Sequence, residues 1–304
     1  MLKLKGVVPA LTTPFKKDLS LDIESFRRLV DLLIEEGVHG LVATGCTGES
    51  WAIEPEEFQE LFIAAVEQAR GRVPIVGGCS GITPRQVIKK ATMAKTAGCD
   101  AVMIQPPYYA LPGEDEVFDF YKEITSAVDI PVMIYNIPRR NGINMSVKLV
   151  DRLADLPGVF SIKESSKDFL HLSAIIRQVS DRIDVFAGYA AVLGIGAITA
   201  GAVGFVDSTA VLYGRGAVDF YDAIIAGDFE KARHLQAEMS SLQAGMFGIG
   251  TFPSALKAAC EFVGRPGGWT RPPIKPLDAE KRAEVHAVLT KAGLIPSGAR
   301  RAVG

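Results

Sequence analysis

The chain has 304 residues, of which 48% are hydrophobic and 22% charged, which is ordinary for a globular protein with a sizeable core. Its formal net charge of −2 gives no reason to expect a nucleic-acid or membrane partner. No apolar run approaches the roughly 20 residues of a membrane span, and the N-terminus lacks a signal-peptide pattern, so we expect a cytoplasmic protein. The cysteines show no CxxC or zinc spacing, which favours free thiols in a reducing compartment at Cys46, Cys79, Cys99 and Cys260.

Eight short segments rich in β-branched residues recur along the first two thirds of the chain. Most are apolar throughout rather than alternating, a pattern typical of parallel strands that are covered on both faces. The predicted strands are residues 6–15, 39–45, 73–80, 101–107, 130–136, 159–165, 184–189 and 202–208.

Segments with helical periodicity fill the intervals between these strands. In residues 22–37, for example, Phe26, Leu29 and Leu33 share one face, and Gly37 is a plausible C-cap. Another helix is expected to begin with Thr83 as N-cap and Pro84 at its first position. Eight strand–helix units up to about residue 226 predict a closed (β/α)8 TIM barrel rather than an open sheet.

The pattern changes after residue 226, where no further strand is predicted. Residues 228–247, 252–264 and 278–293 read as three more helices. We therefore expect a catalytic barrel over residues 1–226 and a C-terminal three-helix appendage within residues 227–304.

Residues that follow the strands of such a barrel face one shared mouth, where active sites are built. None of the four histidines falls at these positions, and no carboxylate–histidine cluster suggests a metal, so no metal site is expected. The strand-end residues are Thr12, Thr13, Cys46, Thr47, Glu49, Tyr108, Tyr109, Tyr135, Arg139, Arg140, Lys163, Ser165, Gly188, Val206 and Ser208.

Lys163 is the residue of this set with the most distinctive chemistry. A lysine within an apolar strand is costly to charge, so its pKa should fall and its neutral amine become available near pH 7. Such an amine can form an imine with a ketone, and a nearby phenol can carry the protons. Backbone amides and hydroxyls in "GCTGES" (45–50) are suited to the carboxylate of a 2-oxo acid at the start of the following helix. The alternative is a snorkelling lysine or a salt bridge to Glu164.

Several motifs in the same order resemble the dihydrodipicolinate synthase/N-acetylneuraminate lyase family of Schiff-base aldolases. They are "GVVPALTTPF", "GCTGES", "PPYY", "YNIPRRNG", "IKESS" and the C-terminal "RPP", which span nearly the whole chain. The resemblance implies a (β/α)8 barrel with a C-terminal helical bundle, commonly assembled as a homotetramer (a dimer of dimers). It also implies a covalent imine through Lys163, with no metal or organic cofactor.

The resemblance also implies roles for individual residues. Lys163 matches the Schiff-base lysine and Tyr135 the tyrosine that relays protons to the imine. Tyr109 matches a tyrosine that crosses a dimer interface to complete the neighbour's relay. The substrate-binding positions implied by the match are Cys46, Thr47, Arg140, Gly188, Val206 and Ser165, with Arg140 near the pocket entrance. Arg139 stands where the synthases usually carry a small residue and is read as a solvated or interface charge.

Three departures bear on the substrate. Synthases usually carry threonine at the position of Cys46, and a thiol is a weak hydrogen-bond donor. Sialic-acid lyases follow "GY" with Asp-Glu, whereas Tyr189 here precedes two alanines. Lysine feedback is not expected, because Pro, Phe, Ile and Gln occupy positions 55, 58, 82 and 86, where lysine-inhibited synthases carry polar residues.

The predicted function is a Schiff-base-forming lyase that acts on pyruvate or a related 2-oxo acid and resembles dihydrodipicolinate synthase. Such an enzyme condenses pyruvate with an aldehyde such as aspartate semialdehyde. The alternative within the family is a catabolic 2-oxo-acid aldolase, dehydratase or deaminase, with a sugar-acid or hydroxyproline-type substrate. The alternative from another class is a barrel that binds a keto acid without turnover.

Overall fold

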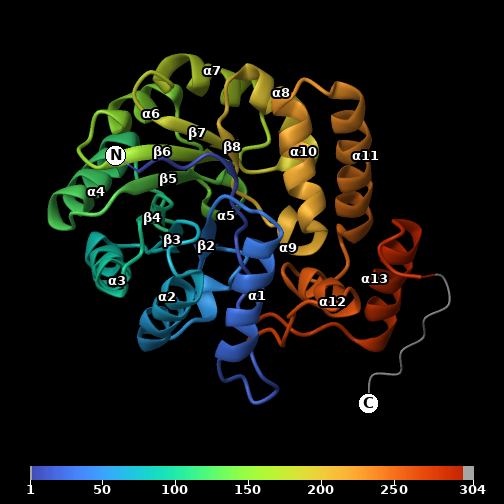
Figure 1. The fold of residues 1–304 in the computed structure, drawn as a ribbon. Coiled ribbons are helices and arrows are strands. Elements are labelled where there is room, and N and C mark those ends of the chain that lie inside the picture. The colour runs from blue at the N-terminus through green and yellow to red at the C-terminus, as the bar shows by residue number, and fades with distance from the viewer. Residues whose placement is uncertain (1, 297–304) are drawn as a thin grey trace.

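The computed structural model describes residues 2–296, and its centre is a ring of eight parallel strands (Figure 1). Each strand pairs with its neighbour in the order β1-β8-β7-β6-β5-β4-β3-β2. A parallel bridge between Ala10 and Val42 joins the two ends, where the Leu11 amide donates to Val42 O at 2.9 Å. The predicted (β/α)8 barrel is therefore confirmed. The strands are β1 (Gly6–Val7), β2 (Leu41–Ala43), β3 (Ile75–Gly78), β4 (Ala101–Ile104), β5 (Val132–Asn136), β6 (Val159–Glu164), β7 (Asp184–Ala187) and β8 (Gly204–Phe205).

The strands are shorter than the apolar segments predicted, most of all at the first one. Of the predicted strand 6–15 only Gly6 and Val7 form a ladder, because Pro9 and Pro14 have no N–H to donate to a neighbouring strand. Strands β1 and β8 approach each other closely, since a Cβ on Gly204 would lie 2.0 Å from Gly6 O. Glycine at position 204 is thus required for the two strands to meet.

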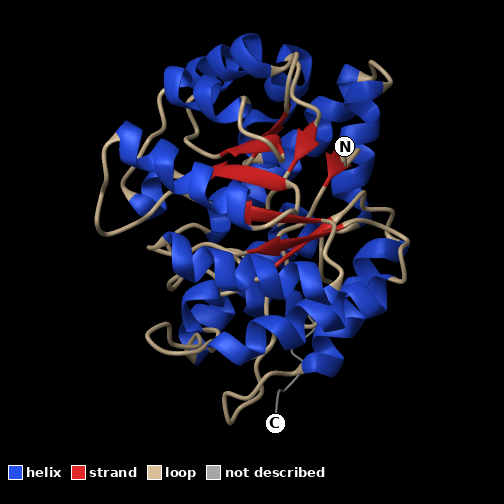
Figure 2. Cartoon of the chain, turned by 90° about the vertical axis from the view of Figure 1, so that its left-hand side faces the viewer, coloured by secondary structure: helices blue, strands red, loops and turns tan. Residues whose placement is uncertain are grey.

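Helices surround the strands, as Figure 2 shows. The α1 helix buries Phe26, Leu29 and Leu33, as predicted, and ends at Glu35. Its C-cap is Glu36 and not the predicted Gly37, which follows the cap in a left-handed conformation (φ 88°). Thr83 and Pro84 begin α3 as predicted, with Thr83 and Gln86 in a capping box. The main barrel helices are α1 (Ile23–Glu35), α2 (Pro55–Ala69), α3 (Pro84–Ala97), α4 (Glu114–Ala127), α6 (Val147–Ala154), α7 (Phe169–Val179), α8 (Ala190–Ala200) and α10 (Arg215–Ile225).

Three short helices lie in loops after the strands. They are the 3₁₀ helix η1 (Ser50–Ala52), α5 (Pro138–Asn141) and α9 (Thr209–Tyr213). No helix within residues 2–296 is long and apolar enough to cross a membrane.

Alternation along the strands separates two apolar cores. On β5, Met133 and Tyr135 point into the barrel, whereas Ile134 packs outward against the helices. The register pairs Met133 with Ser161 and Tyr135 with Lys163 on β6. Lys163 therefore points into the barrel beside Tyr135, at the carboxyl end of the strands.

The predicted C-terminal helices are α11 (Phe229–Met246), α12 (Ser254–Phe262) and α13 (Ala279–Lys291). Figure 1 shows α11 alongside α10, on the flank of the barrel. Lys257 of α12 is fully buried and donates to Thr13 O at 2.7 Å and to Trp269 O at 2.6 Å, and it also pairs with Glu49. These contacts attach the helical region firmly to the barrel mouth. A domain boundary at residue 226 stays a prediction, and residues 297–304 of the predicted appendage lie outside the described part.

Candidate active site

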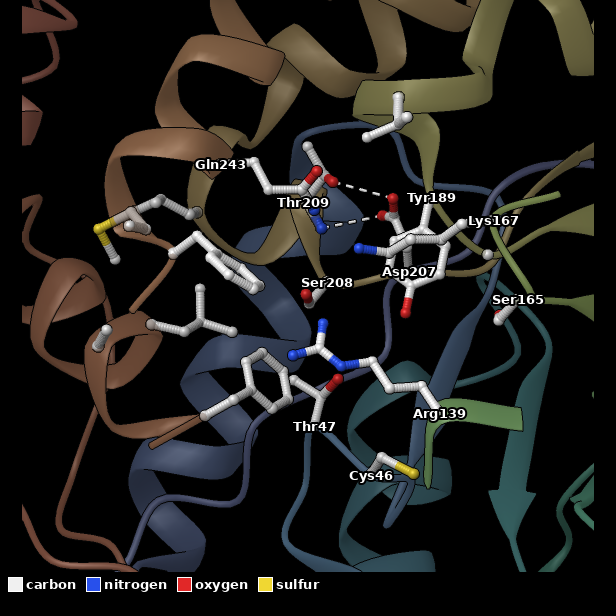
Figure 3. Close-up of a pocket in the computed structure, with 18 of the residues that line it drawn as sticks. Cys46, Thr47, Arg139, Ser165, Lys167, Tyr189, Asp207, Ser208, Thr209 and Gln243 are labelled. Atoms are coloured by element: carbon white, nitrogen blue, oxygen red, sulfur yellow. Dashed lines mark hydrogen bonds between the residues drawn. The ribbon is translucent and has the colours of Figure 1, made fainter. Parts of the chain in front are cut away.

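A cavity of about 790 Å³ opens at the carboxyl ends of the strands (Figure 3). Loops that follow β2, β5, β6, β7 and β8 form one side, and the end of α11 with the segment before α12 forms the other. The predicted site residues that line it are Cys46, Thr47, Tyr135, Arg140, Lys163, Ser165 and Gly188. Its volume is in the range of ligand pockets in enzymes.

Lys163 lies at the inner end of this cavity and is only 5% exposed. On either side of it in the sheet are Tyr135 of β5 and Phe186 of β7. Its Nζ lies 4.1 Å from the centre of the Tyr135 ring. Burial lowers the pKa of Lys163 to about 8, although the nearby Cys46 and Asp207 act in the opposite direction. An appreciable fraction of this amine is therefore neutral and nucleophilic near neutral pH.

Glu164, the alternative partner considered for Lys163, faces the other way on β6. Its carboxylate accepts hydrogen bonds from Asn136 Nδ2 and from the Ser166 amide, each at 2.6 Å. Within residues 2–296, Lys163 forms no salt bridge. The lysine is thus neither snorkelling to solvent nor neutralised by its sequence neighbour.

Tyr135 is buried next to Lys163 and the Cys46 thiol. Burial raises the pKa of Tyr135 well above its usual value, Cys46 and Tyr189 add to the shift, and the Arg140 cation opposes it. The phenol is therefore protonated at neutral pH. It can give a proton to a group bound at Lys163 and take one back, as a general acid–base group must.

The loop after β2 forms the wall beside this pair. The Gly48 and Ser50 amides both donate to Gly45 O, at 3.0 and 3.3 Å, which closes a tight turn. Among the hydrogen bonds of the described residues, none is donated by the amides of Cys46 and Thr47. These two amides and the Thr47 hydroxyl are suited to a carboxylate. The loop leads into the short 3₁₀ helix η1, and the α-helix α2 begins only at Pro55. The prediction that this carboxylate site lies at the start of the following α-helix is therefore wrong.

Gly188 and Ser165 face each other across the loops after β7 and β6. The Gly188 amide donates to Glu164 O at 2.8 Å. A Cβ on Gly188 would lie 1.7 Å from Ser165 Oγ, so only glycine fits here. The Ser165 hydroxyl is buried and has no partner among the described residues, which leaves it available to a bound molecule.

Two predicted site residues do not line the cavity. Val206 is fully buried in the barrel interior, in the same apolar cluster as Phe186. Tyr109 is 91% exposed and has a left-handed backbone (φ 69°). Its neighbour Tyr108 is half-buried, and both burial and the nearby Cys46 raise its pKa. The roles of Val206 and Tyr109 stay predictions.

The cavity also contains residues that the sequence reading missed. Asp207 directly follows Val206 at a strand end, the position that could have drawn attention to it. Its buried carboxylate accepts from the Ala190 amide at 2.8 Å. It also accepts from the Thr209 amide and the Thr209 hydroxyl, each at 2.9 Å (Figure 3). Burial raises the pKa of Asp207, and these amides oppose the rise. No sequence signal indicated that α11 and the segment before α12 would form a wall of the site, with Gln243, Met246, Phe247 and Phe252.

Across residues 2–296, no group of three or more His, Cys, Asp or Glu side chains is arranged to hold a metal ion. The four cysteines are unpaired, and Cys46 is the partly exposed one, at the cavity.

Comparisons with known proteins give consistent results. Residues 3–292 match the model of the dihydrodipicolinate synthetase family. The chain is 33% identical to the 4-hydroxy-tetrahydrodipicolinate synthase of Pelobacter propionicus, over 96% of this chain and 99% of that protein. It is 32% identical to the enzyme of the same name from Methanopyrus kandleri, over 97% and 99% of the two chains.

Solved structures show the same likeness. A dihydrodipicolinate synthase from Bacillus anthracis superposes with a TM-score of 0.92 at 30% identity, covering 98% of this chain and 100% of that one. A prophage protein of the dihydrodipicolinic acid synthase family from E. coli K12, solved in complex with pyruvate, gives a TM-score of 0.92 at 28% identity. That match covers 96% of this chain and 99% of the prophage protein.

Proposed function

Because the chain belongs to the dihydrodipicolinate synthetase family, whose members are lyases of the class I aldolase type, we propose that it forms a Schiff base with pyruvate and condenses it with an aldehyde. The observation that carries the proposal is the buried, unpaired Lys163 with its lowered pKa beside the protonated Tyr135. Aspartate semialdehyde is the aldehyde that we propose, since the curated relatives are 4-hydroxy-tetrahydrodipicolinate synthases.

The first chemical step is imine formation. The neutral Nζ of Lys163 attacks the keto carbon of pyruvate, and the carbonyl oxygen leaves as water. Tyr135 passes to the oxygen the proton that the nitrogen loses, and a second proton from solvent lets the oxygen leave as water and the imine remain protonated. The amides of Cys46 and Thr47 bind the pyruvate carboxylate and hold the keto carbon within reach of the amine.

The second step forms the carbon–carbon bond. The protonated imine withdraws electrons, so the adjacent methyl group loses a proton and becomes an enamine. Its carbon attacks the aldehyde, and the aldehyde oxygen takes up the proton. Arg140 at the cavity edge pairs with the carboxylate of the second substrate, and hydrolysis of the new imine frees Lys163. No metal or organic cofactor takes part in this scheme.

The proposal includes a homotetramer in the cytoplasm. The support for assembly is Tyr109, since a side chain that is 91% exposed on a left-handed residue is unusual for a tyrosine. We propose that it contacts a neighbouring subunit and completes that subunit's proton relay. The support for a reducing compartment is the set of four unpaired cysteines. Light scattering of wild type and Tyr109→Ala would test the assembly.

A panel assay tests the function. Purified protein is incubated with pyruvate and each of a set of aldehydes, including aspartate semialdehyde, and products are identified by mass. Lys163→Ala serves as the matched control. A product formed by wild type and not by Lys163→Ala supports the proposal. Absence of any condensation or cleavage product, with the imine still formed, would make the protein a keto-acid-binding barrel.

Cys46 favours a second candidate, a catabolic 2-oxo-acid aldolase, dehydratase or deaminase. The weakly donating thiol adjoins Tyr135, where a synthase usually has a hydroxyl. In a synthase, Cys46→Thr should raise condensation with aspartate semialdehyde by more than about tenfold, because it restores a full-strength donor. If condensation stays negligible and activity on another 2-oxo acid falls, the second candidate is favoured.

A further inference from the structure

The cations of the cavity share an unusual arrangement, because each lies over an aromatic ring and none forms a salt bridge with a described carboxylate. The pairs, with the distance from the cation to the ring centre, are Lys163–Tyr135 at 4.1 Å, Lys167–Tyr189 at 4.6 Å, Arg139–Phe247 at 5.2 Å and Arg140–Phe252 at 5.6 Å. An aromatic ring attracts and orients a cation without neutralising its charge. These charges therefore remain available to an anion that enters the cavity.

Outside the cavity, each described arginine that lies over an aromatic ring also binds a carboxylate. Arg271 lies over Phe15 but also binds Glu57, at 2.5 and 2.7 Å, and Arg265 pairs with Glu36. The cavity differs from these other sites, where a carboxylate neutralises the arginine that lies over the ring.

Lys167 is held in a backbone conformation that lysine rarely adopts (φ 69°). Hydrogen bonds fix the residues on either side of it. The Ser166 amide donates to Glu164 at 2.6 Å, and the Asp168 amide donates to Ser166 Oγ at 3.1 Å. Glycine would meet this backbone demand without strain, so the presence of lysine points to a use for its side chain.

The Lys167 and Arg139 side chains both extend into the cavity near Ser208 (Figure 3). Partial burial lowers the pKa of Lys167, and the positive charge of Arg139 lowers it further. The two cations are thus close enough to repel each other. Neither forms a hydrogen bond or salt bridge with a carboxylate of the described residues, and the Asp207 carboxylate in the same cavity accepts instead from the Ala190 and Thr209 amides. A negative charge bound between them would relieve this repulsion.

We propose that Arg139 and Lys167 form an outer anion-binding subsite, which selects 2-oxo acid substrates with a second acidic group at the end far from the keto carbon. This subsite is additional to the carboxylate pocket at Thr47 and to Arg140, and the inference rests on the proposed imine chemistry. The expected ligand group is a carboxylate or a phosphate, both of which suit the planar guanidinium of Arg139.

Imine trapping tests the subsite without the need for turnover. Borohydride reduces the imine that Lys163 forms with a 2-oxo acid, and the concentration for half-maximal trapping is read from the labelled protein. The probes are 2-oxoglutarate, 2-oxoadipate and 2-oxopimelate, each against the neutral 2-oxo acid of equal chain length. For at least one pair we expect the dicarboxylic acid to be trapped at about tenfold lower concentration, because charge-assisted hydrogen bonds are the strong ones.

Two variants assign the preference to the proposed residues. The preference is the half-maximal trapping concentration of the neutral 2-oxo acid divided by that of the dicarboxylic acid. Arg139→Gln and Lys167→Gly should each lower this ratio about tenfold, to a value near one. Lys167→Gly is chosen because glycine accepts the left-handed backbone, so the fold is retained. The matched control is Arg152→Gln. Arg152 also lies over an aromatic ring, that of Phe118 at 4.4 Å, but it is outside the cavity and paired with Asp115 at 2.7 Å.

The outcomes separate this inference from the proposed function. If pyruvate does not label Lys163 in wild type, the proposed function fails. If pyruvate is trapped, the subsite is refuted by equal trapping within every pair, by trapping of no probe, or by a ratio that neither variant changes. Competition by glutarate and by inorganic phosphate then shows which anion the subsite prefers.

Discussion

Lys163 should destabilise the folded protein, and its replacement by an uncharged residue of similar length should reverse this. We predict that Lys163→Met abolishes catalysis and raises the free energy of unfolding at pH 7. The fall in pKa from 10.5 to about 8 corresponds to roughly 3 kcal/mol of destabilisation at pH 7, since one pKa unit is about 1.4 kcal/mol. Methionine fits the apolar surroundings formed by Tyr135 and Phe186 without leaving a cavity.

The pH dependence gives the prediction its sharpest form. Between about pH 8 and 10.5 the unfolded chain keeps the Lys163 proton and the folded chain has lost it, so the stability of wild type rises with pH in this window. The free energy of unfolding of Lys163→Met should therefore exceed that of wild type by roughly 3 kcal/mol at pH 7 and by roughly 1 kcal/mol at pH 10. Denaturant unfolding of both proteins at the two pH values measures it. A variant less stable than wild type at pH 7, or a difference in stability independent of pH, would show that the buried charge of Lys163 does not destabilise the fold.

Lys257 provides the matched contrast, because it is equally buried but fully partnered. Its ammonium binds Thr13 O, Trp269 O and the Glu49 carboxylate. Lys257→Met should destabilise the protein by about 3–5 kcal/mol, since it leaves Glu49 buried without a counter-charge. Two lysines of similar burial are thus expected to respond in opposite directions.

Three further predictions concern activity. The value of kcat/KM for pyruvate should rise about tenfold per pH unit below pH 8 and level off above it, because the Lys163 amine loses its proton in this range. A profile that is flat from pH 6 to 9 would contradict this. In steady-state kinetics, Tyr135→Phe should lower kcat by about 10²–10⁴-fold with a much smaller change in KM. An effect confined to KM would mean that the phenol only positions substrate. Gly188→Ala should lower activity at least about tenfold, because the added Cβ would lie 1.7 Å from Ser165 Oγ and displace that side chain. Adding Ser165→Gly to this variant should restore part of the lost activity.

The barrel could be predicted from sequence because most of its strands are apolar throughout and each is followed by a segment with a helical pattern. Lys163 and Tyr135 were also accessible, since a charged or phenolic side chain at the end of a buried strand is conspicuous. Their pairing across β5 and β6 depends on the register. The register shifts by one residue between the pairs Val132–Val159 and Met133–Ser161, and periodicity alone does not show such a shift.

The outer part of the site could not be predicted from the sequence in the same way. Phe247 and Phe252 are some 80 residues from Lys163 in sequence, and no local pattern indicates that they would face Arg139 and Arg140. Arg139 therefore reads from sequence as a solvated charge, whereas in the folded chain it projects into the cavity (Figure 3). Long-range packing of α11 and the segment before α12 on the barrel decides this.

Reductive trapping shows whether Lys163 forms the covalent imine on which the proposed chemistry depends. Wild-type protein is treated with pyruvate and borohydride, digested, and the modified peptide identified by mass spectrometry. We expect a pyruvate-derived addition on Lys163 and no labelling in Lys163→Ala, with Lys257 unmodified in both. Equal labelling of Lys163→Ala, or an addition on another lysine, would show that Lys163 is not the residue that forms the imine.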